Sequence, residues 1–193
     1  HYLSIKHYQI FREPQQIKEE TTMEGFEVTK IGKHIFCILD AGNSSFYMVE
    51  GDEKAAVIDT GITTGKKIMP LLRELTDKPL LLVVTHVHLD HIYHMDEFEE
   101  VYMCHDEKKI DETTLRTLTI GRLKPWNEIH DIHTDSVISL GGTELRICQV
   151  PGHTPGSVVI LETRENYLFT GDAIGSGCGV WMQIPGSSHA LAG

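Results

Sequence analysis

Four side chains that can bind a metal ion occur within six residues near the middle of the chain. Residues 85–91 read Thr-His-Val-His-Leu-Asp-His and directly follow the apolar run 80–84. On a helix, the first two histidines would point about 200° apart, whereas in extended chain they can share one side. The spacing therefore predicts a metal site at a strand end, with the candidate ligands His86, His88, Asp90 and His91.

Two later segments have the same construction, a β-rich run that ends in a tight turn. His153 lies within Pro-Gly-His-Thr-Pro-Gly-Ser at 151–157, and Asp172 follows Phe-Thr-Gly at 169–171. The flanking prolines and glycines fix the backbone and allow it to approach a ligand closely. Three strand ends that each offer imidazole or carboxylate groups are what a preorganised metal site requires.

The elements that must position these side chains alternate between strand and helix. In the first half we expect strands near 27–31, 34–39, 44–50 and 54–59, a helix over 65–75 and a strand over 80–84. In the second half we expect a strand at 101–104, a helix at 106–118, an irregular segment at 119–135, and strands at 143–150, 157–162 and 167–170. The succession of strand, helix and strand predicts a crossover unit whose helices cover the sheet.

Composition narrows the class of protein. The chain has 193 residues, 40% of them hydrophobic, which is enough for one globular domain. Its 17 basic against 28 acidic residues give a net charge of −11, which disfavours nucleic acid as a partner. No apolar run approaches the ~20 residues of a membrane span, and residues 1–25 lack the apolar core of a secretory signal. We therefore expect a cytoplasmic protein with four reduced cysteines and no membrane partner.

The motifs at 85–91, 151–157 and 170–172, preceded by Val-Ile-Asp-Thr-Gly at 57–61, together resemble the metallo-β-lactamase superfamily, in the branch shared with glyoxalase II-like hydrolases. The resemblance covers roughly residues 26–185. It implies an α+β fold, a four-layer αβ/βα sandwich with metal ions at the sheet edges. Residues 1–25 would then be an N-terminal extension, and 26–193 the metallo-β-lactamase-like domain.

The resemblance also implies two adjacent metal sites, carried over motif by motif. One zinc ion would be held by His86, His88 and His153. A second would be held by Asp90, His91 and Asp172, with Asp172 bridging both ions. Zinc suits such a ligand set best, but iron or manganese is also compatible with imidazole and carboxylate.

Two aspartates have implied roles beyond ligation. Asp59 resembles the family's aspartate that accepts a hydrogen bond from a ligand histidine, although an aspartate before Thr-Gly can also simply cap a turn. Two cations over one water lower its pKa to about 7, and the resulting metal-bound hydroxide can attack a carbonyl. Asp90 is the expected catalytic residue, orienting this nucleophile or passing a proton to the leaving group.

The implied function is a metal-dependent hydrolase acting on an ester, thioester, lactone or related small acyl substrate. One alternative is a mononuclear iron oxidoreductase of the persulfide dioxygenase type, because His86, His153 and Asp172 alone supply two imidazoles and a carboxylate. Another is a metal-binding module inactivated by an incomplete second site. The −11 charge disfavours a nuclease, and the fold does not by itself imply β-lactam hydrolysis.

The sequence departs from the family pattern in two places. Ile-Tyr-His at 92–94 stands where the family commonly has small residues, so that Tyr93 either narrows the pocket or re-aims the backbone. After Asp172 the only remaining histidine is His189, in a Gly/Ser-rich stretch without a strand before it. The sequence favours a chain that lacks the family's final elements over a native ligand at His189. We then expect an incomplete second site and self-association through an uncovered face of the C-terminal sheet.

The remaining candidates have plainer interpretations. Four further histidines are expected to pack or face solvent rather than bind metal, namely His94, His105, His130 and His133. Trp126 and Trp181 either line a substrate pocket or cover the edge of the core, and the second interpretation is favoured. Substrate specificity is expected to lie in loops, chiefly 119–135.

Overall fold

The computed structural model describes residues 20–23, 25–41 and 44–174 of the chain. The first half contains β1 (Glu20–Met23), β2 (Phe26–Lys30), β3 (Ile35–Leu39), β4 (Ser45–Glu50), β5 (Ala55–Ile58), α1 (Met69–Leu75), β6 (Leu80–Val84) and α2 (Leu89–Ile92). Then follow the short 3-10 helix η1 (Met95–Glu97), β7 (Glu100–Cys104), η2 (His105–Lys109), α3 (Glu112–Leu118) and η3 (Trp126–Glu128). The last strands are β8 (His130–Ile132), β9 (Val137–Ser139), β10 (Glu144–Gln149), β11 (Val158–Glu162) and β12 (Tyr167–Phe169).

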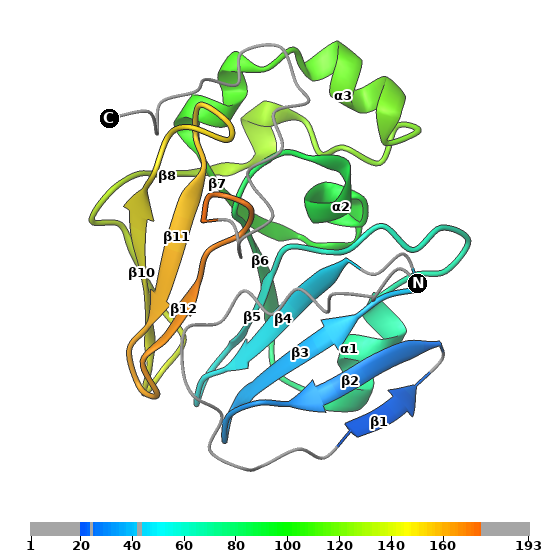
Figure 1. Cartoon of the computed structure of the whole chain (residues 1–193), viewed down its shortest axis with the longest axis vertical. Coiled ribbons are helices and arrows are strands. Elements are labelled where there is room, and N and C mark those ends of the chain that lie inside the picture. The colour runs from blue at the N-terminus through cyan, green and yellow to red at the C-terminus, as the bar shows by residue number, and fades with distance from the viewer. Residues whose placement is uncertain (1–19, 24, 42–43, 175–193) are drawn as a thin grey trace, which may run out of the picture.

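These strands form two sheets that stand side by side (Figure 1). The larger sheet has eight strands in the order β1 to β8, antiparallel from β1 to β5 and parallel from β5 to β8. The smaller has four antiparallel strands in the order β12, β11, β10, β9. The switch to parallel pairing occurs where α1 provides the crossover between β5 and β6, as a parallel pair requires.

The two sheets pack through their apolar inner faces. Along β10, Leu145 and Ile147 are buried while Arg146 and Cys148 are exposed, which is the alternation of a strand with one buried face. The opposing strands contribute Ile58 and Val83 to the same core. A second core lies on the other face of the larger sheet, beneath α1, α2 and α3. Since β6 is covered on both faces, its sequence is continuously apolar.

This arrangement confirms the α+β expectation. Helices, the eight-stranded sheet and the four-stranded sheet supply three layers of the expected sandwich within the described residues. No helix among these residues is long and apolar enough to cross a bilayer. Cys37, Cys104 and Cys148, the cysteines that the described part contains, are free thiols.

The helix expected over 65–75 begins only at Met69. Gly65 adopts a positive φ of 78°, a conformation outside the right-handed helix, so the helix cannot include residue 65. Glu97 accepts hydrogen bonds from the backbone N–H groups of Ile68 (3.3 Å) and Met69 (2.9 Å). This carboxylate therefore satisfies free donors at the N-terminus of α1 and fixes where the helix starts.

The helix expected over 106–118 is two elements, η2 and α3, because Asp111 interrupts it. The Asp111 backbone is extended, and its carboxylate accepts a hydrogen bond from the Thr114 backbone N–H (2.7 Å), so it caps α3. The segment 119–135, expected to be irregular, contains η3 and β8. At the N-terminus, β1 pairs with β2 although it falls within residues 1–25, and the domain boundary at residue 26 stays a prediction.

Backbone hydrogen bonds join the two sheets at opposite ends. At one end, the Val158 N–H at the start of β11 donates to the carbonyl of Thr85, just after β6 (3.0 Å). At the other end, the Asp52 N–H donates to the carbonyl of Gly141 (2.7 Å). The sheets are thus fixed in register where the candidate ligands emerge, as well as at the far end.

Truncation of the inter-sheet core tests how much the fold depends on it. Leu145→Ala removes a fully buried side chain and should lower the free energy of unfolding by about 2–5 kcal/mol. The matched control is Leu118→Ala on α3, where the side chain is 50% exposed and the loss should be under about 1 kcal/mol. Urea denaturation measures both, and equal losses would contradict the assigned packing.

Candidate metal centre

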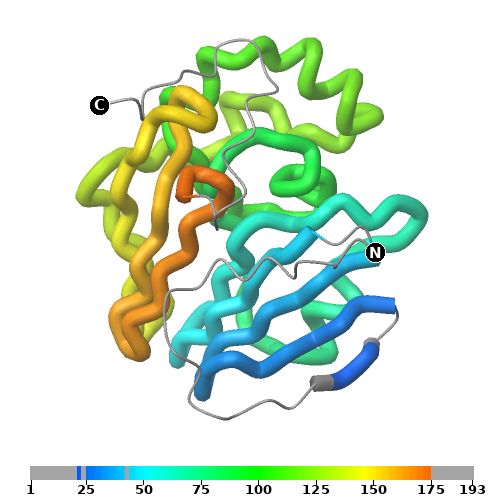
Figure 2. Tube along the Cα trace, in the orientation of Figure 1, coloured from blue at the N-terminus to red at the C-terminus, as the bar shows by residue number. Residues whose placement is uncertain are grey.

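The candidate ligands follow three strands, β6, β10 and β12, whose ends meet at one edge of the sandwich. His86 and His88 follow β6, His153 lies between β10 and β11, and Asp172 follows β12. Figure 2 shows the orange segment after β12 curling toward the green turn that follows β6. His88 is extended (φ −73°, ψ 153°) and precedes the four-residue helix α2, so the first two histidines leave the sheet in extended chain, as their spacing predicts.

Three imidazole nitrogens converge in this cluster. His153 Nε2 lies 3.1 Å from His86 Nε2 and 2.8 Å from His88 Nδ1. Ligand atoms of these three histidines and of Asp172 all lie within 4.8 Å of one another. Zinc bound at about 2.0–2.1 Å by tetrahedral ligands separates neighbouring nitrogens by about 3.3 Å. The observed separations therefore fit a single small cation.

Two of these histidines, His86 and His88, have pKa values that favour the neutral imidazole at neutral pH. Burial, followed by the nearby imidazoles of His91, His88 and His153, holds the pKa of His86 well below its usual value. Burial and the rings of His153 and His91 likewise lower the pKa of His88 to about 4. Neutral imidazoles are the form that binds metal, so the first three-histidine set is ready to accept a cation without releasing protons from His86 or His88.

A second group of donors adjoins the first. His91 Nε2 lies 3.6 Å from Asp90 Oδ2 and 3.6 Å from Asp172 Oδ1. The other Asp172 oxygen, Oδ2, lies 3.6 Å from His153 Nε2 and 4.0 Å from His86 Nε2. Asp172 thus directs one oxygen toward each set, which is the arrangement a bridging carboxylate needs. Within the described residues, the second set consists of these three donors.

Asp59 contacts both ends of the 85–91 loop, at Thr85 and at His91. It is buried with a positive φ of 62°, an uncommon conformation that aspartate tolerates better than most residues. Its carboxylate accepts hydrogen bonds from the Thr85 backbone N–H (2.8 Å) and hydroxyl (2.7 Å), and Oδ2 lies 2.8 Å from His91 Nδ1. This geometry fits the role expected from the sequence, in which Asp59 orients a candidate ligand histidine, and goes beyond a turn cap.

The same contact controls the protonation of His91. Burial alone would lower its pKa, but the carboxylate of Asp59, with smaller contributions from Asp90 and Asp172, raises the pKa to about 9. In the absence of a cation, His91 therefore carries a proton at neutral pH, in contrast to His86 and His88. A cation at the second set must displace this proton.

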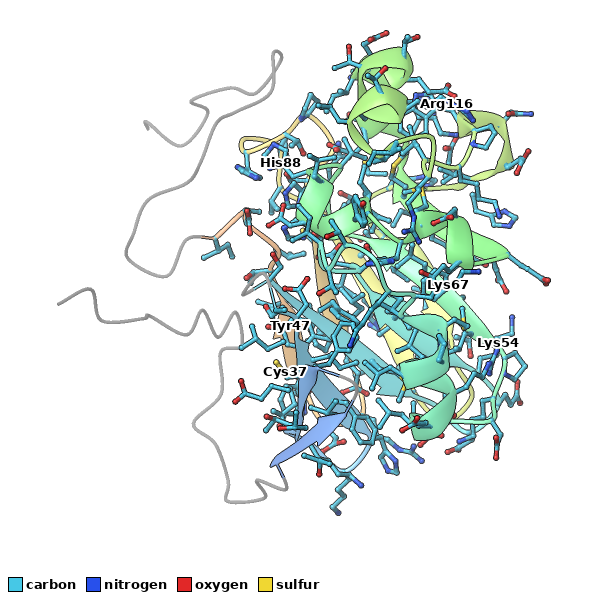
Figure 3. The ribbon with its side chains drawn as sticks, turned by 90° about the vertical axis from the view of Figure 1, so that its right-hand side faces the viewer. Cys37, Tyr47, Lys54, Lys67, His88 and Arg116 are labelled. Atoms are coloured by element: carbon cyan, nitrogen blue, oxygen red, sulfur yellow. The ribbon has the colours of Figure 1, made fainter. Side chains whose placement is uncertain are left out.

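The centre opens on one side. The side chains of Asp90 and Asp172 are 41% and 32% exposed, whereas His86, His91 and His153 are buried. Figure 3 shows His88 at the edge of the molecule, on the opposite side from Lys54 and Lys67. Ser44 Oγ donates a weak hydrogen bond to Asp90 Oδ2 (3.5 Å), which brings the segment before β4 to this opening.

Residues near the centre that sequence reasoning set aside have structural partners. His94 is buried, with Nδ1 2.8 Å from Glu97 Oε1, and the ring of Tyr93 is covered by the Arg122 guanidinium at 5.1 Å. Tyr93 is thus 7% exposed and packs rather than facing the open side of the centre.

The more distant candidates also have structural surroundings. His105 pairs with Asp131 (2.9 Å) on the surface, His130 and His133 are exposed, and Trp126 packs against the helix-side core. None of these histidines belongs to a metal-competent group within the described part of the chain. His189 and Trp181 lie outside the described residues.

Two residues that contact the candidate ligands or their loops, Thr85 and Glu107, were not predicted from the sequence. The Thr85 hydroxyl donates to Asp59, and its Oγ1 lies 3.1 Å from His86 Nδ1. The sequence signal for Thr85 was its position directly before the first histidine of the motif. Glu107 is fully buried and hydrogen-bonds to the loops of both His88 and His153. It lies in the charged run Asp-Glu-Lys-Lys at 106–109, which has the composition of a solvated helix.

The raised pKa of His91 predicts the pH dependence of the chelator-treated protein. A folded-state pKa of about 9 against an unfolded value near 6.5 contributes stability that is fully present below pH 6.5 and is lost as the pH rises through 9. The free energy of unfolding should fall by on the order of 3 kcal/mol over this window. His91→Gln should abolish this decrease and His105→Gln, at an exposed position, should retain it. An unchanged decrease in His91→Gln would refute the assignment.

Known proteins resemble this chain in sequence. A family model described as the metallo-beta-lactamase superfamily matches residues 39–192. The human acyl-coenzyme A thioesterase MBLAC2 is 28% identical over 195 residues, covering 81% of this chain and 69% of that protein. The probable metallo-hydrolase MJ0888 of Methanocaldococcus jannaschii is 32% identical over 153 residues, covering 72% of this chain and 71% of that protein.

Solved structures share the fold. The BLEG-1 B3 metallo-beta-lactamase has a TM-score of 0.60 at 24% identity, covering 79% of this chain and 78% of that one. The class B3 di-zinc metallo-beta-lactamase LRA-12, from an Alaskan soil metagenome, has a TM-score of 0.55 at 19% identity, covering 72% of this chain and 58% of that one. The extent of the family match, the MJ0888 relationship and the shared fold lead to one conclusion. The chain belongs to the metallo-β-lactamase superfamily.

Proposed function

We propose that this chain is a metal-dependent hydrolase that cleaves an acyl thioester or a related small ester or lactone. The observation that carries the proposal is the convergence of three buried or half-buried imidazole nitrogens, with His153 Nε2 within 3.1 Å of the other two. Three neutral imidazoles with a fourth position for water form the donor set of an open, catalytic zinc site. Belonging to a superfamily whose relatives are named as hydrolases supports the same chemistry.

The donor sets suggest how two cations would be shared among the ligands. The first would be held by His86, His88 and His153, and the second by Asp90, His91 and Asp172. Asp172 would contribute to both, since its two oxygens face different sets. Zinc suits these donors best, and iron or manganese would also be accepted. A bound divalent cation would lower the pKa of a coordinated water to about 7 and so provide a nucleophile at neutral pH.

The chain's own residues would direct the reaction. Asp90 Oδ2 lies at the open side of the centre, 3.6 Å from His91 Nε2, and its side chain is 41% exposed. This carboxylate is placed to accept a proton from the attacking water and to pass it to a departing thiol or alcohol. Asp59 Oδ2 contacts His91 Nδ1 at 2.8 Å, on the ring nitrogen that faces away from Asp90. This contact anchors α2, the short helix that carries both Asp90 and His91.

The substrate class rests on the relatives. Three relatives, from human, cattle and chicken, are named acyl-coenzyme A thioesterase MBLAC2 and are 27–28% identical to this chain. A thioester carbonyl is a suitable electrophile for hydroxide attack, so we extend the thioesterase class to this chain. The β-lactamase names of the structural neighbours carry no substrate information at 24% identity or less.

The position of His88 weighs against the iron oxidoreductase alternative. A site of two imidazoles and one carboxylate would use His86, His153 and Asp172 and would leave His88 aside. Instead, His88 Nδ1 lies 2.8 Å from His153 Nε2, closer than any other candidate ligand. Oxygen consumption by the iron-loaded protein with a persulfide would nonetheless establish that alternative and overturn the hydrolase.

Metal removal and restoration test the proposal. The purified protein should hydrolyse an acyl-coenzyme A thioester, lose over about 99% of this activity after chelation, and regain it with added Zn²⁺. Free thiol release measures the rate, and elemental analysis measures the metal content. A chain that binds metal but cleaves no thioester, ester or lactone would be the inactive binding module instead.

A variant pair separates Asp90 from general effects of charge within the same test. Asp90→Asn should lower kcat by about 10²–10⁴-fold while the three-histidine set still binds a cation. Asp96→Asn provides the control, because Asp96 is an exposed aspartate paired with Arg122. Equal kcat values for the two variants would contradict the proposed role of Asp90 in proton transfer.

Self-association through the outer face of the four-stranded sheet stays a prediction, as does a cytoplasmic location. Val137 (51% exposed), Arg146 and Leu161 (36% exposed) lie in register on that face. Pairing of this face with a second copy would be weakened by Leu161→Lys but not by Leu118→Lys on α3, where the leucine is 50% exposed. Light scattering gives the mass, and a monomeric parent protein would contradict the prediction.

A further inference from the structure

One buried carboxylate contacts both loops that carry the three candidate histidine ligands. Glu107, in η2, is 0% exposed. Its Oε2 accepts a hydrogen bond from the backbone N–H of Val87 (2.8 Å), the residue between His86 and His88. Its Oε1 accepts hydrogen bonds from the Gly156 backbone N–H (2.6 Å) and the Thr154 hydroxyl (2.5 Å), just after His153.

Among the described residues, these three donors offset the cost of burying this carboxylate. Burial raises the pKa of Glu107, and its hydrogen bonds to Thr154, Val87 and Gly156 act in the opposite direction. Charge-assisted hydrogen bonds of this kind are shorter and stronger than neutral ones. Because all three donors belong to ligand-bearing loops, any movement of one loop relative to the other leaves part of a buried charge unsatisfied.

The His153 loop is tightly packed against Glu107. A Cβ added at Gly156 would lie 2.6 Å from the Glu107 backbone nitrogen and 2.9 Å from its Oε1. On the loop itself, Ser157 Oγ lies 2.7 Å from Thr154 Oγ1 and accepts from the Thr154 N–H (3.0 Å), which orients that hydroxyl toward Glu107. Glu107 therefore meets the His153 loop at a fixed and crowded distance.

We propose that Glu107 is a positioning residue that sets the distance between the His86–His88 pair and His153. The inference rests on the proposed metal centre. Its ligands lie 67 and 65 residues apart along the chain, so their 2.8–3.1 Å separations depend on contacts between the loops rather than within either one. Metal sites tolerate deviations of only about 0.2 Å in ligand distance. A change at Glu107 then weakens the centre without altering a ligand.

The chain contains a matched control for this role. Glu162 at the end of β11 is also buried, at 1% exposed, and also accepts two backbone N–H groups and a threonine hydroxyl. Its donors are Arg164 N (2.8 Å), Glu165 N (2.8 Å) and Thr143 Oγ1. Glu162 lies at the end of β11 that is remote from the His153 loop, about 13 Å along the strand at ~3.3 Å per residue. Both glutamates thus have the same bonding but only one adjoins the ligands.

Cobalt binding distinguishes positioning from general destabilisation. In the full chain, Glu107→Gln and Glu162→Gln should lose similar amounts of stability, because in each variant the new NH2 group faces a backbone N–H that had donated to a carboxylate oxygen. Only Glu107→Gln should bind Co²⁺ about 10–100-fold more weakly and shift the visible absorption bands of the bound ion. If the parent protein shows no such bands, the proposed centre itself fails. If it shows them and the two variants match each other, the role of Glu107 is refuted.

Two further variants keep the test valid should Glu107→Gln not fold. Thr154→Val removes one donor to the carboxylate and should weaken Co²⁺ binding, whereas Thr154→Ser keeps the hydroxyl and should restore it. Gly156→Ala keeps the carboxylate and all three donors, but its added Cβ collides with Glu107 and forces the loop away from it, so this variant should reproduce the weakened binding. Normal Co²⁺ affinity in both Thr154→Val and Gly156→Ala would overturn the inference.

Discussion

The packing of the two sheets against each other is the constraint on which the rest of the structure depends. His86 and His88 emerge from the eight-stranded sheet, and His153 and Asp172 emerge from the four-stranded one. Neither sheet alone supplies all three histidines of the first set, His86, His88 and His153. The inner faces, with Leu145 and Ile147 opposite Ile58 and Val83, hold the strand ends at a common edge, and the Thr85–Val158 backbone hydrogen bond fixes their register there.

Around that edge, buried carboxylates perform separate tasks. Asp59 faces His91 from within the larger sheet and raises its pKa, whereas burial and neighbouring imidazoles lower the pKa values of His86 and His88. Glu107 contacts backbone and hydroxyl donors rather than ligand rings. The two sets of donors therefore differ in protonation although Asp172 lies beside both. This difference arises from position in the fold, since the ligand types overlap.

Much of the centre could be predicted from sequence because its ligands carry local signals. His86, His88 and His153 are histidines at strand ends beside turn residues, and the structure brings them together with Asp172. Element boundaries were less predictable: the positive φ of Gly65 and the distant Glu97 cap decide where α1 begins. Glu107 could not be recognised, because its neighbours along the chain are charged and its burial depends on donors 20 to 49 residues away. Hydrogen bonds across such separations leave no periodicity in a single sequence.

The 67-residue separation of His86 and His153 has a consequence for folding. A zinc finger gathers its ligands from one short segment, so that the metal can nucleate the fold. Here the loop to be closed is long, and its ends meet only after β10 and β11 have docked on the larger sheet. The unfolded chain keeps the local cluster at 86–91 but not its pairing with His153 and Asp172, so a cation binds the native state more tightly and stabilises it by mass action. A complete centre therefore requires the two sheets to be docked, and their separation removes His153 and Asp172 from His86 and His88.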